Sequence, residues 1–288
     1  MTDPFSRLIL DKVQISFGAK ADLIALVPLA GDASSRRYHR VRVNGPGVPE
    51  SLIVMELPDA SALPLSSEEL AIFKSGPAEL PFLNVHRFLE GIGVRVPKLY
   101  GRWPNDGILL LEDLGDTALW DRVQGLGEAQ TLSWYRKAID ELLTLQVRGT
   151  RARDQACIAF QQRFDLNLYL WEFEHFIEWG LVKRPGAKAP VNGMERLRKR
   201  FRGIAELLDR QAACLNHRDY HSWNLLVHNE TVCVIDFQDA LLAPPQYDLA
   251  SLLNDRVTDS VIQPRLEEQL VRYYLERRND LEKRAMDA

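Results

Sequence analysis

The chain has 288 residues, of which 46% are hydrophobic, so it can bury a sizeable core in one large domain or in two lobes, which argues against disorder. Its 36 basic and 40 acidic residues give a net charge of −4, which creates no general attraction to nucleic acid or to an anionic membrane. We therefore expect a small-molecule partner, no nucleic acid and no membrane, and a monomer or weak dimer.

The cysteines and the apolar runs indicate the compartment. Cys157, Cys214 and Cys233 lie far apart and form no CxxC pair, so neither a disulfide framework nor a thiolate zinc site is predicted. No stretch approaches the roughly 18 apolar residues that a membrane span needs. We expect a cytoplasmic protein that is not exported.

The first part of the chain has the pattern of a small antiparallel sheet. Apolar and β-branched runs between residues 25 and 57 flank a Gly/Pro turn at 44–50. A helix is expected over 81–93, where Pro81 fits the first turn and a glycine ends it. Two short strands around a turn at 104–107 complete a β-rich lobe, which we place at residues 1–112.

Helical spacing dominates the second lobe, which we place at residues 113–288. Apolar residues recur at helical intervals in the segments 128–146, 163–181, 193–211 and 265–284, and the last of these predicts a solvated final helix. Two apolar runs within 225–237 predict an embedded β-hairpin. The expected fold class is α+β, with a small β-rich lobe, a larger helical lobe and a ligand in the cleft between them.

A polar stretch, HRDYHSWN, precedes this hairpin, and Asp236 follows the hairpin's second strand. A tight turn would bring Asp219, Asn224 and Asp236 together. Carboxylate and amide oxygens suit a hard cation such as Mg²⁺, and a carboxylate that holds no metal can accept a proton from an attacking hydroxyl. This division of labour is that of phosphoryl transfer. The alternative is that Asp219 and Asn224 only cap turns.

The spacing HxDxxxxN, followed by an apolar strand that ends in Asp, resembles the catalytic loop of kinases. The segment is similar to that of the aminoglycoside phosphotransferase and choline kinase superfamily, whose fold is related to protein kinases. The resemblance implies a two-lobed, protein-kinase-like fold with ATP and Mg²⁺ as cofactors. The implied roles are a catalytic base at Asp219, supporting loop residues at His217 and Arg218, and metal ligands at Asn224 and Asp236.

Further segments resemble the bacterial N-acetylmuramate/N-acetylglucosamine kinases, which phosphorylate the anomeric hydroxyl of cell-wall amino sugars during recycling. The similarity covers most of the chain from about residue 30 to 255. The segments come in the same order and are GDASSRRYHRV (31–41), PFLNVHRFLEGIGVRVP (81–97), ILLLEDLGD (108–116), EFEHFIEWG (172–180) and DFQDALLAPPQYDLASLLND (236–255).

The resemblance makes the first lobe a nucleotide-binding lobe. GDASSRR would cover the ATP phosphates, because backbone amides and guanidinium groups bind polyphosphate. The connection after LLLEDLG would meet adenine, and ordinary turns are the alternative for both segments. The implied nucleotide contacts are Ser34, Ser35, Arg36, Arg37, Glu112 and Leu114.

One position departs from the superfamily's pattern. Such kinases usually carry a lysine on the third strand that pairs with the α- and β-phosphates, whereas this segment has Met55 and Glu56. The phosphate charge is then left to Mg²⁺ and to Arg36 or Arg37. The missing lysine favours a catalytically silent nucleotide-binding regulator as an alternative of another class.

An acidic, aromatic helix within 163–181 is the candidate acceptor site. Helical spacing predicts a buried stripe of Leu166, Leu170, Phe173, Ile177 and Leu181, with Trp171, Glu174 and Glu178 on another face. An aromatic plate beside carboxylates suits a sugar or an aminoglycoside, and a solvated acidic face is the alternative. The candidate acceptor-binding residues are Glu172, Glu174, Glu178, Trp223 and Asp239.

Asp248 is predicted to cap a helix and to brace the catalytic loop. The expected function is that of an ATP- and Mg²⁺-dependent kinase that phosphorylates an amino sugar, with N-acetylmuramate or N-acetylglucosamine at the anomeric hydroxyl favoured. An aminoglycoside or another hydroxylated metabolite is the alternative acceptor. A metal-dependent hydrolase built on the same acids is a weaker possibility.

Overall fold

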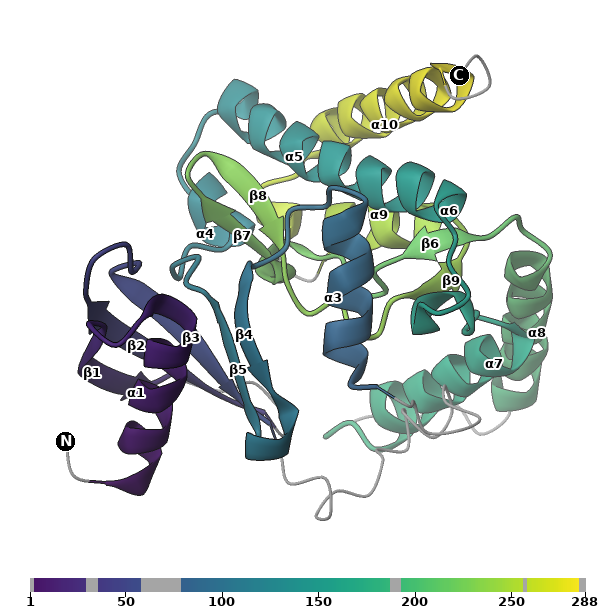
Figure 1. Ribbon diagram of the computed structural model, residues 1–288. Coiled ribbons are helices and arrows are strands. Elements are labelled where there is room, and N and C mark those ends of the chain that lie inside the picture. The colour runs from purple at the N-terminus through teal and green to yellow at the C-terminus, as the bar shows by residue number, and fades with distance from the viewer. Residues whose placement is uncertain (1–2, 30–35, 58–78, 187–192, 256–257, 285–288) are drawn as a thin grey trace. The chain divides into compact units, whose positions relative to one another are not determined.

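The computed structural model describes residues 3–29, 36–57, 79–186, 193–255 and 258–284, whose elements are labelled in Figure 1. Contacts within the chain define two compact units. The first comprises Met1–Leu65 and Pro97–Asp116, and the second comprises Ser66–Val96 and Thr117–Ala288. The helix expected over 81–93 therefore groups with the second unit, not with the strands that surround it in sequence.

The first unit is built on a five-stranded antiparallel sheet in the order β1-β2-β3-β5-β4. The helix α1 packs on this sheet, with Ile9 and Val13 fully buried against Val41, Leu52 and Leu110 (Figure 1). The unit's elements are α1 (Pro4–Phe17), β1 (Asp22–Pro28), β2 (Arg37–Asn44), β3 (Ser51–Glu56), β4 (Leu99–Trp103), the short 3-10 helix η1 (Pro104–Asp106) and β5 (Ile108–Glu112).

The sequence pattern predicted the strands and turns of this unit but not α1. The expected turn at 44–50 contains Gly47 at φ 72°, and the turn at 104–107 ends at Gly107 with φ 70°. Helix α1 has its own start signals, since the Asp3 carboxylate accepts the N–H of Ser6 and Pro4 occupies the first turn. These signals were present in the sequence and were overlooked.

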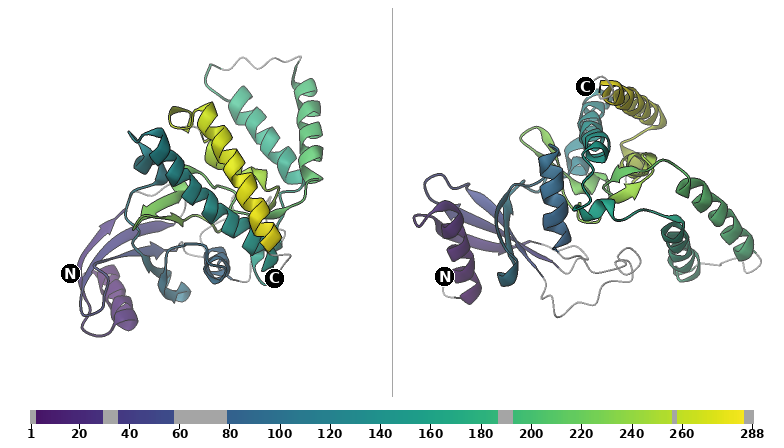
Figure 2. Two further views of the ribbon diagram at one scale, coloured as in Figure 1. Left: turned by 90° about the horizontal axis from the view of Figure 1, so that it is seen from above. Right: turned by 45° about the vertical axis from the view of Figure 1, so that its right-hand side comes forward.

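The second unit is mainly helical. Its helices and helical turns are α3 (Pro81–Gly91), α4 (Leu119–Val123), α5 (Glu128–Leu143), the π-helical turn η2 (Thr144–Arg148), α6 (Gly149–Arg151), η3 (Ile158–Phe160), α7 (Leu166–His175), the π-helical segment η4 (Phe176–Val182), α8 (Met194–Asp209), η6 (Ser222–Asn224), α9 (Gln246–Leu253), η7 (Thr258–Ser260) and α10 (Pro264–Arg284). Helices α7 and α8 lie side by side, as do α5 and α10 (Figures 1 and 2).

The charge pattern of the final helix predicted that it is solvated, but one face of this helix is buried. Helix α10 packs along α5 and buries Leu266, Leu270 and Tyr274, which are 3%, 0% and 2% exposed. These three residues are four apart along the chain, so they form one apolar stripe. Because most residues of α10 are charged, its overall composition gave no sign of this apolar stripe.

Two small antiparallel strand pairs hold the segment between α8 and α9. Strand β6 (Cys214–Asn216) pairs with β9 (Leu241–Ala243), and β7 (Leu225–His228) pairs with β8 (Thr231–Val234). The predicted hairpin is therefore confirmed. Its turn residues Asn229 and Glu230 have φ values of 47° and 59°, the left-handed pair that a type I′ turn requires.

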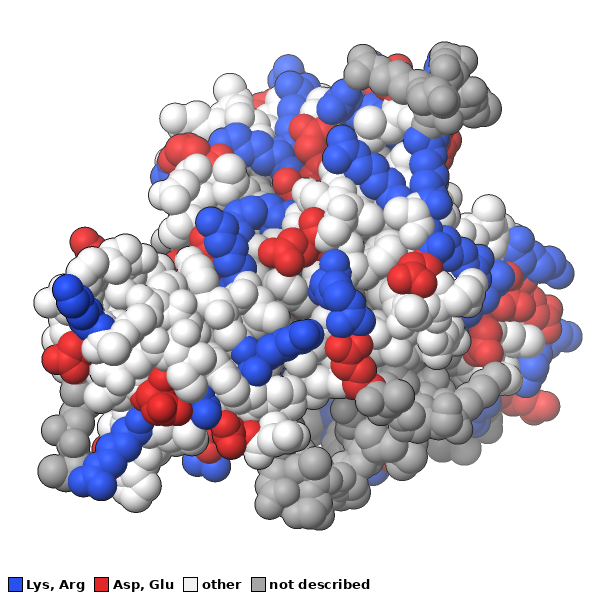
Figure 3. Space-filling view, in the orientation of Figure 1, with Lys and Arg blue, Asp and Glu red and all other residues white. Residues whose placement is uncertain are grey.

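No helix of the described ranges is long and apolar enough to span a membrane. On the face drawn in Figure 3, basic and acidic side chains are interspersed, in keeping with the net charge of −4. The cysteines Cys157, Cys214 and Cys233 are buried free thiols.

Candidate active site

The stretch from His217 to Asn224 connects β6 to β7, and Asp236 lies two residues beyond the end of β8. Because β7 and β8 pair in register, the ends of this stretch and of β8 are neighbours. The N–H of Ile235 donates to the carbonyl of Asn224 at 3.1 Å. The hairpin thus places the backbone of Asn224 beside that of Ile235, the residue before Asp236.

Asp248 fixes the start of this catalytic loop. Its carboxylate is fully buried and accepts the backbone N–H of His217 at 2.6 Å and that of Arg218 at 3.0 Å. Burial raises the pKa of Asp248 to about 7, against the two N–H donors, which lower it. The predicted brace is present, but the predicted cap is wrong. Pro245 is the N-cap of α9, and Asp248 lies inside the first turn.

The imidazole of His217 ties the loop to the strand that leads to Asp236. The ring is fully buried, and its Nε2 lies 2.8 Å from the carbonyl of Ile235. Since a carbonyl only accepts, Nε2 must carry the proton, and Nδ1 can then accept the N–H of Asp219 at 3.3 Å. Burial lowers the pKa of His217, which favours this neutral form.

The three predicted chemical residues face outward from this frame. The side chains of Asp219 and Asp236 are exposed and that of Asn224 is half-buried. The amide nitrogen of Asn224 donates to the backbone carbonyl of Asp219 at 3.0 Å, which leaves the amide oxygen to act as an acceptor elsewhere. The amide of Gln238 donates to Asp236 at 2.8 Å and to Asp239 at 3.1 Å. Asp239 thus sits beside Asp236.

This donor set fits a hard divalent cation. Asp236 supplies a carboxylate from a left-handed backbone position at φ 62°, and Asn224 supplies an amide oxygen. In the described part of the chain, no cluster of three or more His, Cys, Asp or Glu residues could hold a metal ion. A cation at Asn224 and Asp236 would therefore need further ligands from water or from a substrate, as Mg²⁺ commonly does.

Arg218 connects the loop to α7. Its backbone is left-handed at φ 86°, an unusual conformation for a residue other than glycine, and its side chain is 6% exposed. A guanidinium nitrogen lies 3.5 Å from the carboxylate of Glu172. Glu172, predicted as an acceptor contact, thus lies next to the catalytic loop through an ion pair with Arg218.

The other two acidic candidates of this segment are also paired. Their partners are Arg198 of α8 and Lys183, which directly follows η4. Glu174 accepts two hydrogen bonds from Arg198 of α8 at 2.7 and 2.9 Å, and Glu178 pairs with Lys183. Both pairs are solvent-exposed, so the carboxylates remain accessible to a polar ligand.

The predicted buried stripe of this helix was wrong in part. Leu168 and Tyr169 are the buried residues of α7, Ile177 is buried as predicted, and the other predicted stripe residues are only half-buried. Three of these residues, Leu166, Leu170 and Phe173, lie in regular α-helix and flank a buried face centred on Leu168 and Tyr169. The backbone changes to π-helix at Phe176, so the wider turn affects only the last stripe positions, Ile177 and Leu181. Trp171 packs against the core cluster of Phe164 and Tyr169 instead of joining a separate face.

Trp223, the last acceptor candidate, is 40% exposed within the catalytic loop. Its ring lies beside that of Trp120 from α4, with a centroid distance of 5.9 Å. An exposed indole next to Asp219 and Asn224 in sequence is available for stacking.

The nucleotide candidates belong to the first unit. Ser34 and Ser35 lie outside the described residues. Arg37 begins β2, is 77% exposed, and pairs with Glu56 at 3.6 Å, while Arg36 directly precedes it. His39 lies 3.2 Å from the same carboxylate. The strand position without lysine is thus a Glu56 carboxylate with basic neighbours.

The connection after β5 is held by its own polar contacts. The Glu112 N–H donates to the carbonyl of Lys98 at 2.9 Å, and its carboxylate accepts the Lys98 N–H at 3.0 Å. The Glu112 N–H is therefore occupied, and Leu114 is buried at 4% exposure.

The sequence reading missed a guanidinium clamp on this connection. Arg40 of β2 donates to both oxygens of Asp113 and of Asp116, at distances from 2.7 to 3.0 Å. Ser51 of β3 also bonds to Asp113. The sequence does show two acids, Asp113 and Asp116, shortly after an apolar strand. No spacing rule, however, pairs them with an arginine 73 positions earlier in the chain.

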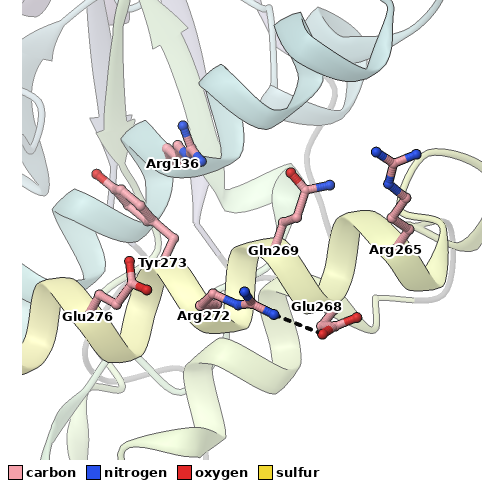
Figure 4. A pocket seen from close by; sticks show the side chains of 7 residues that line it. All are labelled: Arg136, Arg265, Glu268, Gln269, Arg272, Tyr273 and Glu276. Carbon is pink, nitrogen blue, oxygen red and sulfur yellow. Dashed lines mark hydrogen bonds and ion pairs between the residues drawn. The ribbon is translucent and has the colours of Figure 1, made fainter.

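A pocket of about 360 Å³ lies between α5 and α10 (Figure 4). It contains none of the predicted site residues. Its lining is Arg136, Arg265, Glu268, Gln269, Arg272, Tyr273 and Glu276. Position and chemistry both separate it from the catalytic loop, and we assign it no ligand.

Comparison with known proteins identifies the class. The model of the phosphotransferase enzyme family matches residues 25–286, and the chain belongs to this family. Solved structures with the same fold include the aminoglycoside phosphotransferase APH(2'')-Ib, ADP-bound, with a TM-score of 0.61 at 17% identity, covering 98% of this chain and 86% of that one. Choline kinase LicA from Streptococcus pneumoniae has a TM-score of 0.58 at 16% identity, covering 94% and 80%. The expected two-lobed, kinase-like α+β fold is confirmed.

Within this family, the chain is similar to curated N-acetylmuramate/N-acetylglucosamine kinases. The protein of this name from Pseudomonas aeruginosa is 32% identical over 86% of this chain and 65% of its own length. The one from Caulobacter vibrioides is 31% identical over 89% and 74%. The one from Neisseria meningitidis is 28% identical over 78% and 60%. The chain thus spans less than two thirds of the length of two of these three relatives.

Proposed function

We propose that the chain is a nucleotide-dependent kinase that phosphorylates an amino sugar, with N-acetylmuramate or N-acetylglucosamine as acceptor and the anomeric hydroxyl as the attacked position. The observation that carries the proposal is the arrangement of Asp219, Asn224 and Asp236 around the β7–β8 hairpin, on a frame held by His217 and Asp248. The names of the curated relatives support the choice of acceptor.

In this proposal, Asp219 is the general base. Its exposed carboxylate takes the proton of the acceptor hydroxyl while the acceptor oxygen bonds to the γ-phosphorus of ATP. The bond between the γ-phosphorus and the bridging oxygen breaks, and ADP leaves with that oxygen. The sugar gains a phosphoryl group, and the proton passes from Asp219 to solvent.

Asn224 and Asp236 would hold Mg²⁺, which when bound neutralises phosphate charge during transfer. His217 holds the carbonyl of Ile235 and so sets the direction in which Asp236 leaves the hairpin. Arg218 and Asp248 fix the backbone on the other side of Asp219. Glu172, Glu174, Glu178, Trp223 and Asp239 remain the proposed acceptor contacts, and Arg36, Arg37, Ser34, Ser35, Glu112 and Leu114 the proposed nucleotide contacts.

Product analysis tests this function. The protein is incubated with ATP, Mg²⁺ and, separately, N-acetylmuramate, N-acetylglucosamine, choline or kanamycin, and the products are read by phosphorus NMR and mass spectrometry. The proposal predicts an acid-labile sugar 1-phosphate from the first two acceptors. Turnover with choline or kanamycin alone would overturn the choice of acceptor, and ADP formation without any phosphorylated acceptor would indicate a hydrolase.

A nucleotide-binding regulator is the second candidate, and one observation favours it. The third strand has no lysine: Met55 and Glu56 stand where the family usually has one. Met55 is buried at 1% exposure, and the Glu56 carboxylate pairs with Arg37 and His39, so neither residue can pair with a phosphate. This candidate predicts nucleotide binding without product from any of the four acceptors. It gives no reason for a base and two metal ligands on a braced loop.

A further inference from the structure

A buried chain of hydrogen bonds leads from α10 to the strand that precedes the catalytic loop. Its centre is Gln146, which is 0% exposed at the middle of the π-helical turn η2. The amide nitrogen of Gln146 donates to Asn216 Oδ1 at 3.1 Å and to the carbonyl of Pro245 at 2.9 Å. Its amide oxygen accepts the hydroxyl of Tyr274 at 2.6 Å and a guanidinium N–H of Arg278 at 3.1 Å. Both N–H groups and both lone pairs of Gln146 are therefore used.

The orientations of the Gln146 and Asn216 amide groups are fixed by their partners. Arg278 can only donate, so the Gln146 oxygen must face it. At the other end, Asn216 donates to the carbonyls of Cys214 at 3.0 Å and Ala243 at 2.8 Å, which can only accept. The Asn216 oxygen is consequently left as the acceptor that Gln146 requires. Reversing either amide would set donor against donor or oxygen against oxygen at a buried site, which is costly.

Both acceptors of the Gln146 amide are next to parts of the catalytic frame. Asn216 directly precedes His217, whose ring holds the carbonyl of Ile235. Pro245 directly precedes α9, whose Asp248 accepts the N–H groups of His217 and Arg218. The amide of Gln146 thus connects the end of β6 with the start of α9, the two segments that hold the backbone of His217 and Arg218.

Resting on the proposed function, we propose that Gln146 is a positioning residue for the catalytic loop, and that Tyr274 and Arg278 of α10 hold its amide in the orientation that positions Asp219. The last long helix of the chain thereby acts on phosphoryl transfer without touching a substrate. Tyr274 is suited to this task as a permanent donor, since burial raises its pKa to about 12.

The neighbouring tyrosine provides a matched control. Tyr273 lies on the same helix and its hydroxyl donates to Asp140 of α5 at 2.9 and 3.0 Å. Its ring lies beside Arg136, 5.0 Å from the guanidinium carbon, in the pocket between α5 and α10 (Figure 4). Tyr273→Phe therefore removes a hydroxyl from the α5–α10 interface without touching the Gln146 chain.

The first test is hydrogen exchange of the full chain, read by mass spectrometry on peptides that cover residues 214–225. Tyr274→Phe is expected to speed exchange of this segment about fivefold, because one buried hydrogen bond that holds the amide is lost. Tyr273→Phe is expected to leave the segment unchanged. Equal exchange in the two variants would overturn the proposal, and this test requires no knowledge of the acceptor.

The second test is kinetic. Tyr274→Phe is expected to lower kcat about fivefold while the KM values for nucleotide and acceptor stay within about twofold, whereas Tyr273→Phe leaves kcat unchanged. On a Gln146→Met background, Tyr274→Phe is expected to lower kcat by less than about twofold further, since the hydroxyl then keeps only its longer contact with the Pro245 carbonyl, at 3.3 Å. A full additional loss on that background, or a rise in KM at constant kcat, would contradict the proposal.

The two tests separate this inference from the proposed function. If the parent protein phosphorylates no sugar, the proposed function fails and the exchange comparison still decides whether α10 holds the loop. If Gln146→Met does not fold, the comparison of Tyr274→Phe with Tyr273→Phe decides by itself.

Discussion

At the scale of single residues, the loop from His217 to Asn224 is held by buried polar groups, each of which has one possible hydrogen-bonding arrangement. His217 is held as a neutral ring by one donor and one acceptor, and Asp248 by two backbone N–H groups. Such groups stabilise a loop only while their protonation states match their partners. The pH dependence of stability therefore reports on this frame.

Asp248 gives the first prediction. Its pKa is about 7 in the folded protein and near 3.8 in the unfolded chain, so between these values the folded state binds the extra proton. Its contribution to the free energy of unfolding is fully present below pH 3.8 and is lost as the pH rises through about 7, with a slope of at most about 1.4 kcal/mol per pH unit. Urea unfolding of the parent and of Asp248→Asn from pH 5 to 8 measures this difference. A parent that gains stability relative to the variant as the pH rises would contradict the assignment.

The Arg40 clamp gives the second prediction. A lysine cannot bond to both oxygens of Asp113 and of Asp116, so Arg40→Lys should lower the free energy of unfolding by about 1–2 kcal/mol. Arg42, exposed on the same strand, provides the control, and Arg42→Lys should change stability by less than about 0.5 kcal/mol. Thermal and urea unfolding measure both variants. Equal effects would show that the clamp adds nothing to an ordinary surface arginine.

At the scale of elements, local patterns predicted most strands and helices, but not α1 or the buried stripe of α10. The strands around residues 25–57, the helix at Pro81 and the β7–β8 hairpin follow from local patterns. The buried face of α7 was partly wrong because apolar residues occur on several sides of this helix, and the face that the fold buries is centred on Leu168 and Tyr169. Gln146 was missed although it stands as a polar residue in an apolar run, because its partners come from three distant segments.

The hairpin turn gives the third prediction. Glu230 has φ 59°, where a residue with a Cβ is strained and glycine is not. Glu230→Gly and Glu230→Ala both remove the carboxylate that lies near Arg122 and Lys137, so the pair isolates the backbone effect. The glycine variant should be more stable than the alanine variant by about 1 kcal/mol. Equal free energies of unfolding would mean that the turn relaxes to another type in the variants.

At the scale of the whole molecule, family membership and the kinase-like fold were predictable because short motifs at fixed spacing imply both. From the loop HRDYHSWN and the segment DFQDA the sequence predicts that Asp219, Asn224 and Asp236 converge. In the second unit the hairpin places Asn224 beside Ile235, the residue before Asp236. The acceptor contacts were less predictable. Glu174 is paired with Arg198 of α8, a cation whose proximity depends on the tertiary fold. Glu178 is paired with Lys183, which directly follows the same helical segment.

Asp219 is the proposed acceptor of the proton of the sugar hydroxyl during phosphoryl transfer. Asp219→Asn keeps the size of the side chain and removes its basicity. Asp280→Asn, at an exposed position on α10, is the matched control for the loss of one charge. The decisive measurement is kcat with N-acetylmuramate or N-acetylglucosamine, alongside the Kd for ATP from calorimetry. We predict that Asp219→Asn lowers kcat by about 100-fold or more with the Kd for ATP changed less than about threefold, and that Asp280→Asn retains the kcat of the parent within about twofold. An Asp219→Asn variant with the kcat of the parent would contradict the account.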